Sequence, residues 1–326
     1  MTIIELQSSR LEEAFEIFKA SYCRQREFVP VLEEENARPD LVLPMLEGCL
    51  KKHRGVAVYD HEKMVGYMTG FYIEEFLSPH KGVYSPEWAH GSVEESAFDI
   101  YRLMYRKIGQ IWADDGCLTH AANTMNYAGS AREAFFWNGF GGICIDAVRE
   151  VKPLAAKRQE GLRIESIKEE DLPEWLAMVE GHYYHLANAP VFKPYHAQEK
   201  QTVEALAELL ARPGNHAWIA RVGDSAAGYM KIAPSEDGAG WMVGGRARFA
   251  VNGAFVYPGF RGRGIAGALL DEIMIWGAEQ GMQRCSVDFE ATNIEACHFW
   301  LRYFQPVCRS VVRRLDANLS RGLRPE

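Results

Sequence analysis

A chain of 326 residues is long enough for two domains of ordinary size, and its 48% hydrophobic and 25% charged residues are typical of a globular protein rather than a disordered one. The formal net charge is −8, with 44 acidic against 36 basic residues, which argues against a general binder of nucleic acid or of anionic membranes. We therefore expect any anionic ligand to be bound by a local cluster of basic side chains.

The beginning of the chain has early acidic residues and no basic segment followed by a long apolar stretch, so we expect no signal peptide. The sequence contains no run of about 18 uncharged apolar residues, so we expect no membrane-spanning helix. The seven cysteines are scattered, odd in number and never spaced as Cys-x-x-Cys, which favours free thiols in a reducing compartment. These features predict a cytoplasmic protein.

Segments of the sequence recur at nearly constant offsets of 161, 162 and 163 residues: 6–15 with 167–176, 65–68 with 227–230, and 136–137 with 299–300. The agreement indicates two copies of one module, whose period of ~160 residues is too long for a solenoid repeat. A polar stretch without periodicity separates the copies. We therefore predict a first domain at 1–152, a linker at 153–161 and a second domain at 162–326.

Both copies predict the same order of elements: a strand, two helices, a hairpin, a strand, a helix of about four turns, a strand, a short helix and a last strand. The expected opening strands and helices are Ile3–Leu6 and Leu11–Ala20, then Arg163–Ile167 and Leu172–Tyr183. The later strands are expected at Gly82–Tyr84, Cys117–Ala122 and Ile143–Val148, and at Ala250–Tyr257, Arg284–Phe289 and Val307–Leu315. The long helices should end at Gly116 and Gly281, because glycine commonly follows a helix C-terminus. This order predicts an α/β (α+β) fold in which each copy forms a twisted mixed, mainly antiparallel sheet flanked by helices.

A glycine-rich loop in the second copy, residues 255–266, joins an expected strand to an expected helix. Helix N-termini leave backbone N–H groups unpaired, and small residues there let an anion approach them closely. Between Gly238 and Leu270 the acidic chain has four arginines and no acid. These features predict a pyrophosphate site. No Gly-Lys-Ser/Thr follows, which excludes a Walker A loop, and the strand is late in its module, which argues against a Rossmann fingerprint.

Residues 256–266 resemble the acyl-CoA loop of the GNAT acetyltransferase superfamily. The loop begins with Val256-Tyr257-Pro258. It continues with Arg261-Gly262-Arg263-Gly264-Ile265-Ala266, which matches the family's pattern Arg/Gln-x-x-Gly-x-Gly/Ala. The segment from Asn293 to Trp300 is similar to that family's next motif, Asn-x-x-Ala-x-x-Phe-Tyr. The resemblance covers 162–315 closely and extends loosely to the first copy through the duplication. It implies two tandem GNAT-like domains.

The resemblance also implies an N-acetyltransferase that moves an acetyl group directly from acetyl-CoA to a primary amine of a small molecule or peptide, in a ternary complex and without a metal. The implied cofactor-binding residues are Phe255, Val256, Arg261, Gly262, Arg263, Gly264, Ile265, Ala266, Asn293 and Trp300. In the family the strand before the loop binds the pantetheine arm through its backbone, and the loop N–H groups bind the pyrophosphate.

The first copy lacks this loop. Its matching segment, 83–95, contains no arginine or lysine and has three carboxylates, so we expect coenzyme A to be rejected there. Ser92 and Glu95 are spaced as a capping box, which would satisfy the start of the following helix with the protein's own side chains. We expect a degenerate, non-catalytic copy that supports the fold.

The candidates for catalysis depart from the family's pattern. Trp300 stands where the family often has a tyrosine as general acid, and an indole N–H does not give up its proton near neutral pH. Tyr303, one helical turn on, is the alternative acid or else a core aromatic. Asp288 and Glu290 share one face of a strand, and one of them could contact the acceptor amine or its water. The alternatives are a salt bridge to a nearby arginine or exposure at the end of the strand.

Histidines and tyrosines gather in the first-helix region of the second copy, at His182, His185 and His196 and their neighbours. They complete no metal set at familiar spacing, and in the family this region lines the acceptor pocket. The leading hypothesis is a tandem acetyltransferase with one working site, as a monomer or homodimer. The alternatives are an acyl-CoA-binding module with weak or no turnover, and an interaction protein.

Overall fold

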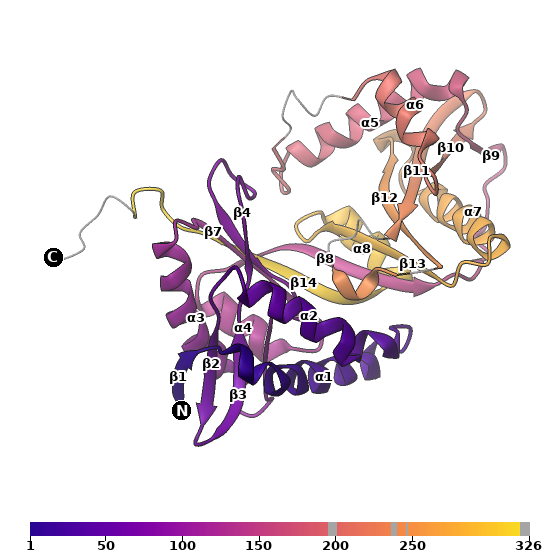
Figure 1. The fold of residues 1–326 in the computed structure, drawn as a ribbon. Helices are drawn as coiled ribbons and strands as arrows, with labels where there is room; N and C mark the ends of the chain where they lie inside the picture. Colours follow the sequence, from indigo (N-terminus) through magenta and orange to yellow (C-terminus); the bar gives the residue numbers. More distant parts are fainter. Residues whose placement is uncertain (195–200, 236–239, 246, 320–326) are drawn as a thin grey trace. The chain divides into compact units, whose positions relative to one another are not determined.

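The computed structural model describes residues 1–194, 201–235, 240–245 and 247–319, and it divides into two compact units (Figure 1). Unit 1 comprises Met1–Ile145, Gly240–Met242 and Pro306–Glu326, and unit 2 comprises Asp146–Ala239 and Val243–Gln305. The units are therefore interleaved along the chain, because the end of the second copy belongs to unit 1. The boundaries at 1–152, 153–161 and 162–326 remain a prediction, because they mark the two copies of the sequence repeat and not the compact units.

Unit 1 contains four α-helices in its described part: α1 (Leu11–Phe28), α2 (Pro39–Leu50), α3 (Ala97–Asp114) and α4 (Gly129–Trp137). Its strands are β1 (Thr2–Glu5), β2 (Val56–Asp60), β3 (Lys63–Met68), β4 (Phe71–Ile73), β5 (Gly82–Ser85), β6 (His90–Ser92), β7 (Thr119–Met125) and, apart from its first residue, β14 (Gln305–Arg314). Strand β8 (Gly141–Glu150) begins in unit 1 and ends in unit 2.

The strands of unit 1 form two groups. Strands β1, β2, β3 and β6 make an antiparallel sheet in that order, and β4, β5, β7 and β14 neighbour one another in that order. Within the second group β5 runs parallel to β7, and β14 runs antiparallel to β7 with Cys308 opposite Met125. The main core of unit 1 packs α3 on strands β2 and β3 and against α4, through apolar side chains such as Val58, Met104 and Phe135.

Unit 2 is an α/β sandwich. Its elements are β9 (Leu162–Ser166), α5 (Leu172–Ala187), α6 (Val203–Ala211), β10 (His216–Val222), β11 (Ser225–Pro234), β12 (Arg248–Val256), α7 (Ile265–Glu279), β13 (Arg284–Glu290) and α8 (Ile294–Tyr303). Strands β9 to β12 pair antiparallel in chain order, and β12 then pairs parallel with β13. Figure 1 shows α5 and α6 on one face of this sheet and α7 on the other.

The side-chain pattern explains this layering. Leu172, Trp175 and Val179 recur at helical spacing in α5 and pack on Ile219 and Tyr229 of the sheet. The intervening residues of the same strands point to the other face of the sheet. There the Trp218 ring contacts the Trp276 ring of α7, with 5.6 Å between the ring centroids.

The predicted fold class is confirmed: both units are mixed α/β structures in which helices flank largely antiparallel sheets. Gly116 and Gly281 follow the ends of α3 and α7 with φ of +84° and +71°, as expected for helix C-termini. Helix α1 is longer than predicted because its buried face continues through Tyr22 and the polar Gln25. The short strands β4 and β6 have no periodic pattern and were not predicted.

The predicted linker is anchored on α7. The carboxylate of Asp271, itself buried, accepts hydrogen bonds from the backbone N–H groups of Leu154 at 2.6 Å and Ala156 at 3.0 Å. Bonds from N–H groups to a carboxylate are stronger than bonds between neutral groups. Part of the segment at 153–161 therefore has a fixed course along the helix.

We expect Asp271→Ala to lower the free energy of unfolding by about 2–3 kcal/mol, because it leaves two backbone N–H groups without their acceptor. Urea unfolding would measure the change. The neighbouring Glu272→Ala is a matched control, since it removes only a partly exposed ion pair with Arg158 and should cost less than about 1 kcal/mol. Equal losses for the two variants would contradict the anchoring role of Asp271.

Candidate functional site

Strands β12 and β13 separate halfway along their length. Their parallel pairing runs from Arg248 opposite Arg284 to Val251 opposite Val287, although β12 continues to Val256. At the same point the register between β11 and β12 shifts, so that Asn252 is an extra residue in β12. A β-bulge bends its strand and increases the local twist, which accounts for the separation.

The loop after β12 leaves the start of α7 open. Gly262 and Gly264 have φ of +75° and +80°, a region that favours glycine, and Gly264 is the N-cap residue without any side-chain cap. A Cβ at Gly262 would meet nothing within 4 Å, and one at Gly264 only the Lys157 carbonyl at 3.8 Å. The N–H groups of the first turn are therefore approachable by an anion.

A cavity of about 700 Å³ opens at this helix start, within the size range of small-molecule sites. Of the ten predicted cofactor-binding residues, the cavity is lined by Phe255, Val256, Arg261, Gly262, Gly264, Ile265, Ala266, Asn293 and Trp300. Arg263 is the exception, because its guanidinium lies over the Phe260 ring at 5.5 Å from the centroid. The structure thus brings two separate sequence motifs to one cavity.

Arg261 is held by neighbours on both sides of the loop. Its Nε donates to the Val256 carbonyl at 3.0 Å, and its Nη1 lies 3.6 Å from a carboxylate oxygen of Glu295. The Val256 carbonyl thus already accepts one hydrogen bond from within the protein. Arg261 fixes the course of the loop and keeps a positive charge at the cavity wall.

Asn293 and Tyr303 lie at the two ends of α8. The Asn293 side-chain oxygen caps the helix by accepting from the Ala296 N–H at 3.1 Å, which leaves its amide N–H groups as donors for the cavity. The Tyr303 hydroxyl lies 3.3 Å from the position that a Cβ of Gly267 would occupy, close to the start of α7. Trp300 is buried between Phe299 and Phe304.

Several lining residues were not singled out by the sequence. Ala156 and Lys157 from the predicted linker reach the cavity, as do Tyr229, Met230 and Arg302. A lysine in an aperiodic polar stretch carries no signal of its own, and its position depends on the bonds to Asp271. The Asn252-Gly253 pair within β12 was a readable sign of the bulge, since glycine inside a strand often marks one.

The face of the sheet covered by α5 carries a group of polar side chains. His182 Nδ1 lies 3.2 Å from the Tyr229 hydroxyl, and both residues line the cavity, as does His185. Burial lowers the pKa of His182 to about 4, helped by the positive charges of Lys231 and Lys193, so its imidazole is neutral at pH 7. His196 lies outside the described residues.

Asp288 and Glu290 do not line the cavity. They alternate with buried Val287 and Phe289, as predicted for one face of a strand. Glu290 forms an ion pair with Lys193 at 2.6 Å. The Asp288 side chain reaches solvent, but surrounding protein atoms displace much of the water around its carboxyl group. This partial desolvation raises the pKa of the carboxyl, and the positive charge of Lys193 opposes the rise.

The neutral state of His182 predicts a pH-dependent stability difference. Below about pH 6.5 the unfolded histidine takes up a proton that the folded one resists until about pH 4, so acidification through this window destabilises the fold. The stability of wild type relative to His182→Gln should fall by about 3 kcal/mol between pH 7 and pH 4. Urea unfolding at several pH values measures it, with exposed His298→Gln as control. A constant difference would contradict the assignment.

The start of α3 in the first copy offers no comparable anion site among its described residues. Helix α3 begins at Ala97, and Ser92 ends β6, so the predicted capping box is wrong; Ser96 is the N-cap and makes no side-chain cap bond. The reason is the extra strand β6, which delays the helix. Glu87 is buried, accepts from the Met242 N–H at 2.9 Å, and has its pKa raised by burial.

Some features of the whole described chain bear on function. No described helix is both long and apolar enough to cross a membrane. Within the described residues no group of three or more His, Cys, Asp or Glu side chains is arranged to hold a metal ion. All seven cysteines have free thiols.

Several solved structures resemble this chain, and the first of them, with a TM-score above 0.5, supports the fold. A GCN5-related N-acetyltransferase from Sphaerobacter thermophilus is 14% identical, with a TM-score of 0.57 over 96% of this chain and 95% of that one. An acetyltransferase of the GNAT family from Colwellia psychrerythraea is 13% identical, with a TM-score of 0.45 over 97% and 100% of the two chains. A GCN5-related N-acetyltransferase from Kribbella flavida is 12% identical, with a TM-score of 0.41 over 97% and 71%.

No curated protein matches the sequence. The model of the acetyltransferase (GNAT) family matches residues 181–304, a stretch that includes the open start of α7, the separated strands and α8. Residues 181–304 are therefore identified as a GNAT acetyltransferase domain, the family whose members transfer acyl groups.

Proposed function

We propose that this protein is an N-acetyltransferase that transfers an acetyl group from acetyl-CoA to a primary amine of a small molecule or peptide, with its one working site in unit 2. The observation that carries the proposal is the uncapped start of α7, which opens into the 700 Å³ cavity beside the separated strands. The family match over 181–304 supports acyl transfer as the chemistry.

The residues of the cavity fit the parts of acetyl-CoA. The N–H groups from Gly262 to Ala266 would hold the pyrophosphate, assisted by the charge of Arg261, and the Asn293 amide would donate to the pantetheine arm. Phe255 and Val256 would offer their backbone along the separated strand. Bound there, acetyl-CoA supplies an activated thioester; Lys157 and Arg302 add positive charge around it.

The transfer needs two proton movements. An amine attacks only as the free base, and the departing thiolate is stabilised by a proton. We assign the second task to the Tyr303 hydroxyl, which lines the cavity, and we keep Asp288 and Glu290 as proposed contacts of the acceptor amine. The neutral imidazole of His182 and the Tyr229 hydroxyl would orient the acceptor. Free thiols and acetyl-CoA use suit the cytoplasm.

Trp300 favours one alternative, an acyl-CoA-binding protein with weak or no turnover. Its indole fills the family's tyrosine position, is buried, and can only donate a hydrogen bond. Cofactor binding without any acceptor-dependent thiol release would distinguish this alternative from the enzyme.

We expect calorimetry of the intact chain to find one acetyl-CoA bound per chain, because α3 of the first copy has acidic residues and no basic cluster at its start. A stoichiometry of two would contradict the assignment to unit 2 alone. Thiol release from acetyl-CoA, screened against amines, polyamines, aminoglycosides and peptides, then tests turnover. Absence of both binding and release would overturn the proposed function.

A further inference from the structure

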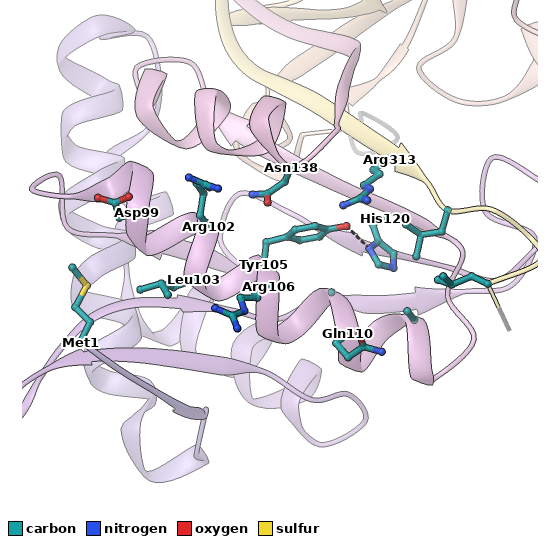
Figure 2. A pocket seen from close by; sticks show the side chains of 14 residues that line it. Met1, Asp99, Arg102, Leu103, Tyr105, Arg106, Gln110, His120, Asn138 and Arg313 are labelled. Carbon is teal, nitrogen blue, oxygen red and sulfur yellow. Dashed lines mark hydrogen bonds between the residues drawn. The ribbon is translucent and has the colours of Figure 1, made fainter. Parts of the chain in front are cut away.

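A second cavity lies entirely within unit 1, and the proposed acetyl transfer does not use it. Its volume is about 840 Å³, in the size range of small-molecule sites. It extends along the side of α3 from Asp99 to Ala113 and is completed by His120 of β7 and Arg313 of β14 (Figure 2). It therefore follows the length of the helix and is not a remnant of an anion site at the helix start.

The inner wall of this cavity is a fixed chain of hydrogen bonds. His120 Nε2 lies 3.1 Å from the Cys117 carbonyl, which can only accept, so the proton of the neutral ring is on Nε2. His120 Nδ1 must then accept from the Tyr105 hydroxyl at 2.9 Å. Both side chains are buried, and burial lowers the pKa of His120 to about 4, so the ring contributes no charge at pH 7.

Three arginines line the cavity without a carboxylate partner. Among the described residues no carboxylate oxygen lies within 4.0 Å of the guanidinium of Arg102, Arg106 or Arg313. Arg313 is placed over the Tyr105 ring, 5.7 Å from its centroid, and its charge opposes the burial that raises the pKa of Tyr105 to about 12. Figure 2 shows the three arginine side chains around Tyr105.

The charge balance of the cavity points to its ligand. Asp99 is the single carboxylate among the described lining residues, so three arginines leave a net side-chain charge of +2 (3 − 1 = 2) in a chain whose total is −8. Guanidinium groups bind carboxylate and phosphate oxygens through paired N–H bonds. We propose that this cavity binds a small anion with two negative charges, carried by a phosphate monoester or a dicarboxylate, through Arg102, Arg106 and Arg313.

Calorimetric titration of the full chain at pH 7.5 tests the proposal with two probes, inorganic phosphate and succinate, which distinguish the two ligand chemistries. Binding of at least one probe should weaken tenfold or more in the double variant Arg102→Gln/Arg106→Gln. Both side chains are exposed, so the fold should be retained, as circular dichroism would check. Arg313→Gln, on another element, should weaken the same probe at least threefold.

The matched control is Arg10→Gln/Arg38→Gln, which removes the same charge from exposed arginines of unit 1 that already pair with Glu13 and Asp40. Its affinity for the probe should equal that of wild type. The charge-preserving variant Arg102→Lys/Arg106→Lys should weaken binding less than the glutamine pair. The proposal would be overturned if neither probe binds, or if the cavity variants bind the probe as tightly as wild type. Phosphate bound only at the α7 loop would give the second of these results, because the cavity variants do not change that loop.

Discussion

Gly264→Glu should weaken acetyl-CoA binding by at least 100-fold while leaving the protein folded. Gly264 is the N-cap of α7 with φ of +80°, and a carboxylate there would place negative charge and bulk where the diphosphate must approach backbone N–H groups. Calorimetry with acetyl-CoA measures the loss, and circular dichroism checks the fold.

Gly281→Glu provides a closely matched control for this variant. Gly281 follows the other end of the same helix, has φ of +71°, and a Cβ there would meet nothing within 4 Å. Both substitutions therefore impose a similar backbone cost, of about 1–2 kcal/mol, and the same added charge. Normal acetyl-CoA affinity in Gly264→Glu, or an equal loss in both variants, would show that the loop has only a structural role.

Tyr303→Phe should lower kcat by about 100-fold and leave the affinity for acetyl-CoA unchanged. General acid catalysis is worth ~10²–10⁴-fold, and the phenol is the titratable group of α8 placed beside the start of α7. Steady-state turnover with the amine found by the screen, together with calorimetry, separates the two effects.

Two further variants make the test of Tyr303 sharper. Trp300→Phe removes a buried indole that cannot act as an acid and should change turnover less than about tenfold, through packing alone. Gly267→Ala keeps the phenol but places a methyl group 3.3 Å from its hydroxyl, so it should lower kcat by displacing that group. If Tyr303→Phe loses only a few-fold, the thiolate takes its proton from water or from the acceptor amine.

The elements with strong local signals could be predicted from the sequence. The start of α7 was readable because glycines, arginines and an apolar helical face occur together in one short stretch. The ends of α3 and α7 were readable because glycine adopts the required positive φ more readily than other residues. Strand β13 was readable because its carboxylates alternate with buried apolar residues.

The parts that depend on distant contacts could not be predicted. Lys157 reaches the cavity only because two backbone N–H groups near it bond to Asp271, more than a hundred residues away. The capping box failed because β6 pairs with β3 and delays α3, a tertiary contact with no local pattern. The arginines of the unit 1 cavity come from distant parts of the sequence, Arg102 and Arg106 from α3 and Arg313 from β14, so no motif contains them.

The pairing of β14 with β7 has a consequence for how the protein is made. Strand β7 leaves the ribosome long before β14, and at ~5–20 residues per second the delay between Met125 and Arg314 is roughly 10–40 s. During this interval the nascent N-terminal unit has an unsatisfied strand edge, which is a site for mispairing and for chaperone capture. Completion of unit 1 must therefore await the translation of β14, and termination directly after α8 would leave unit 1 without this strand.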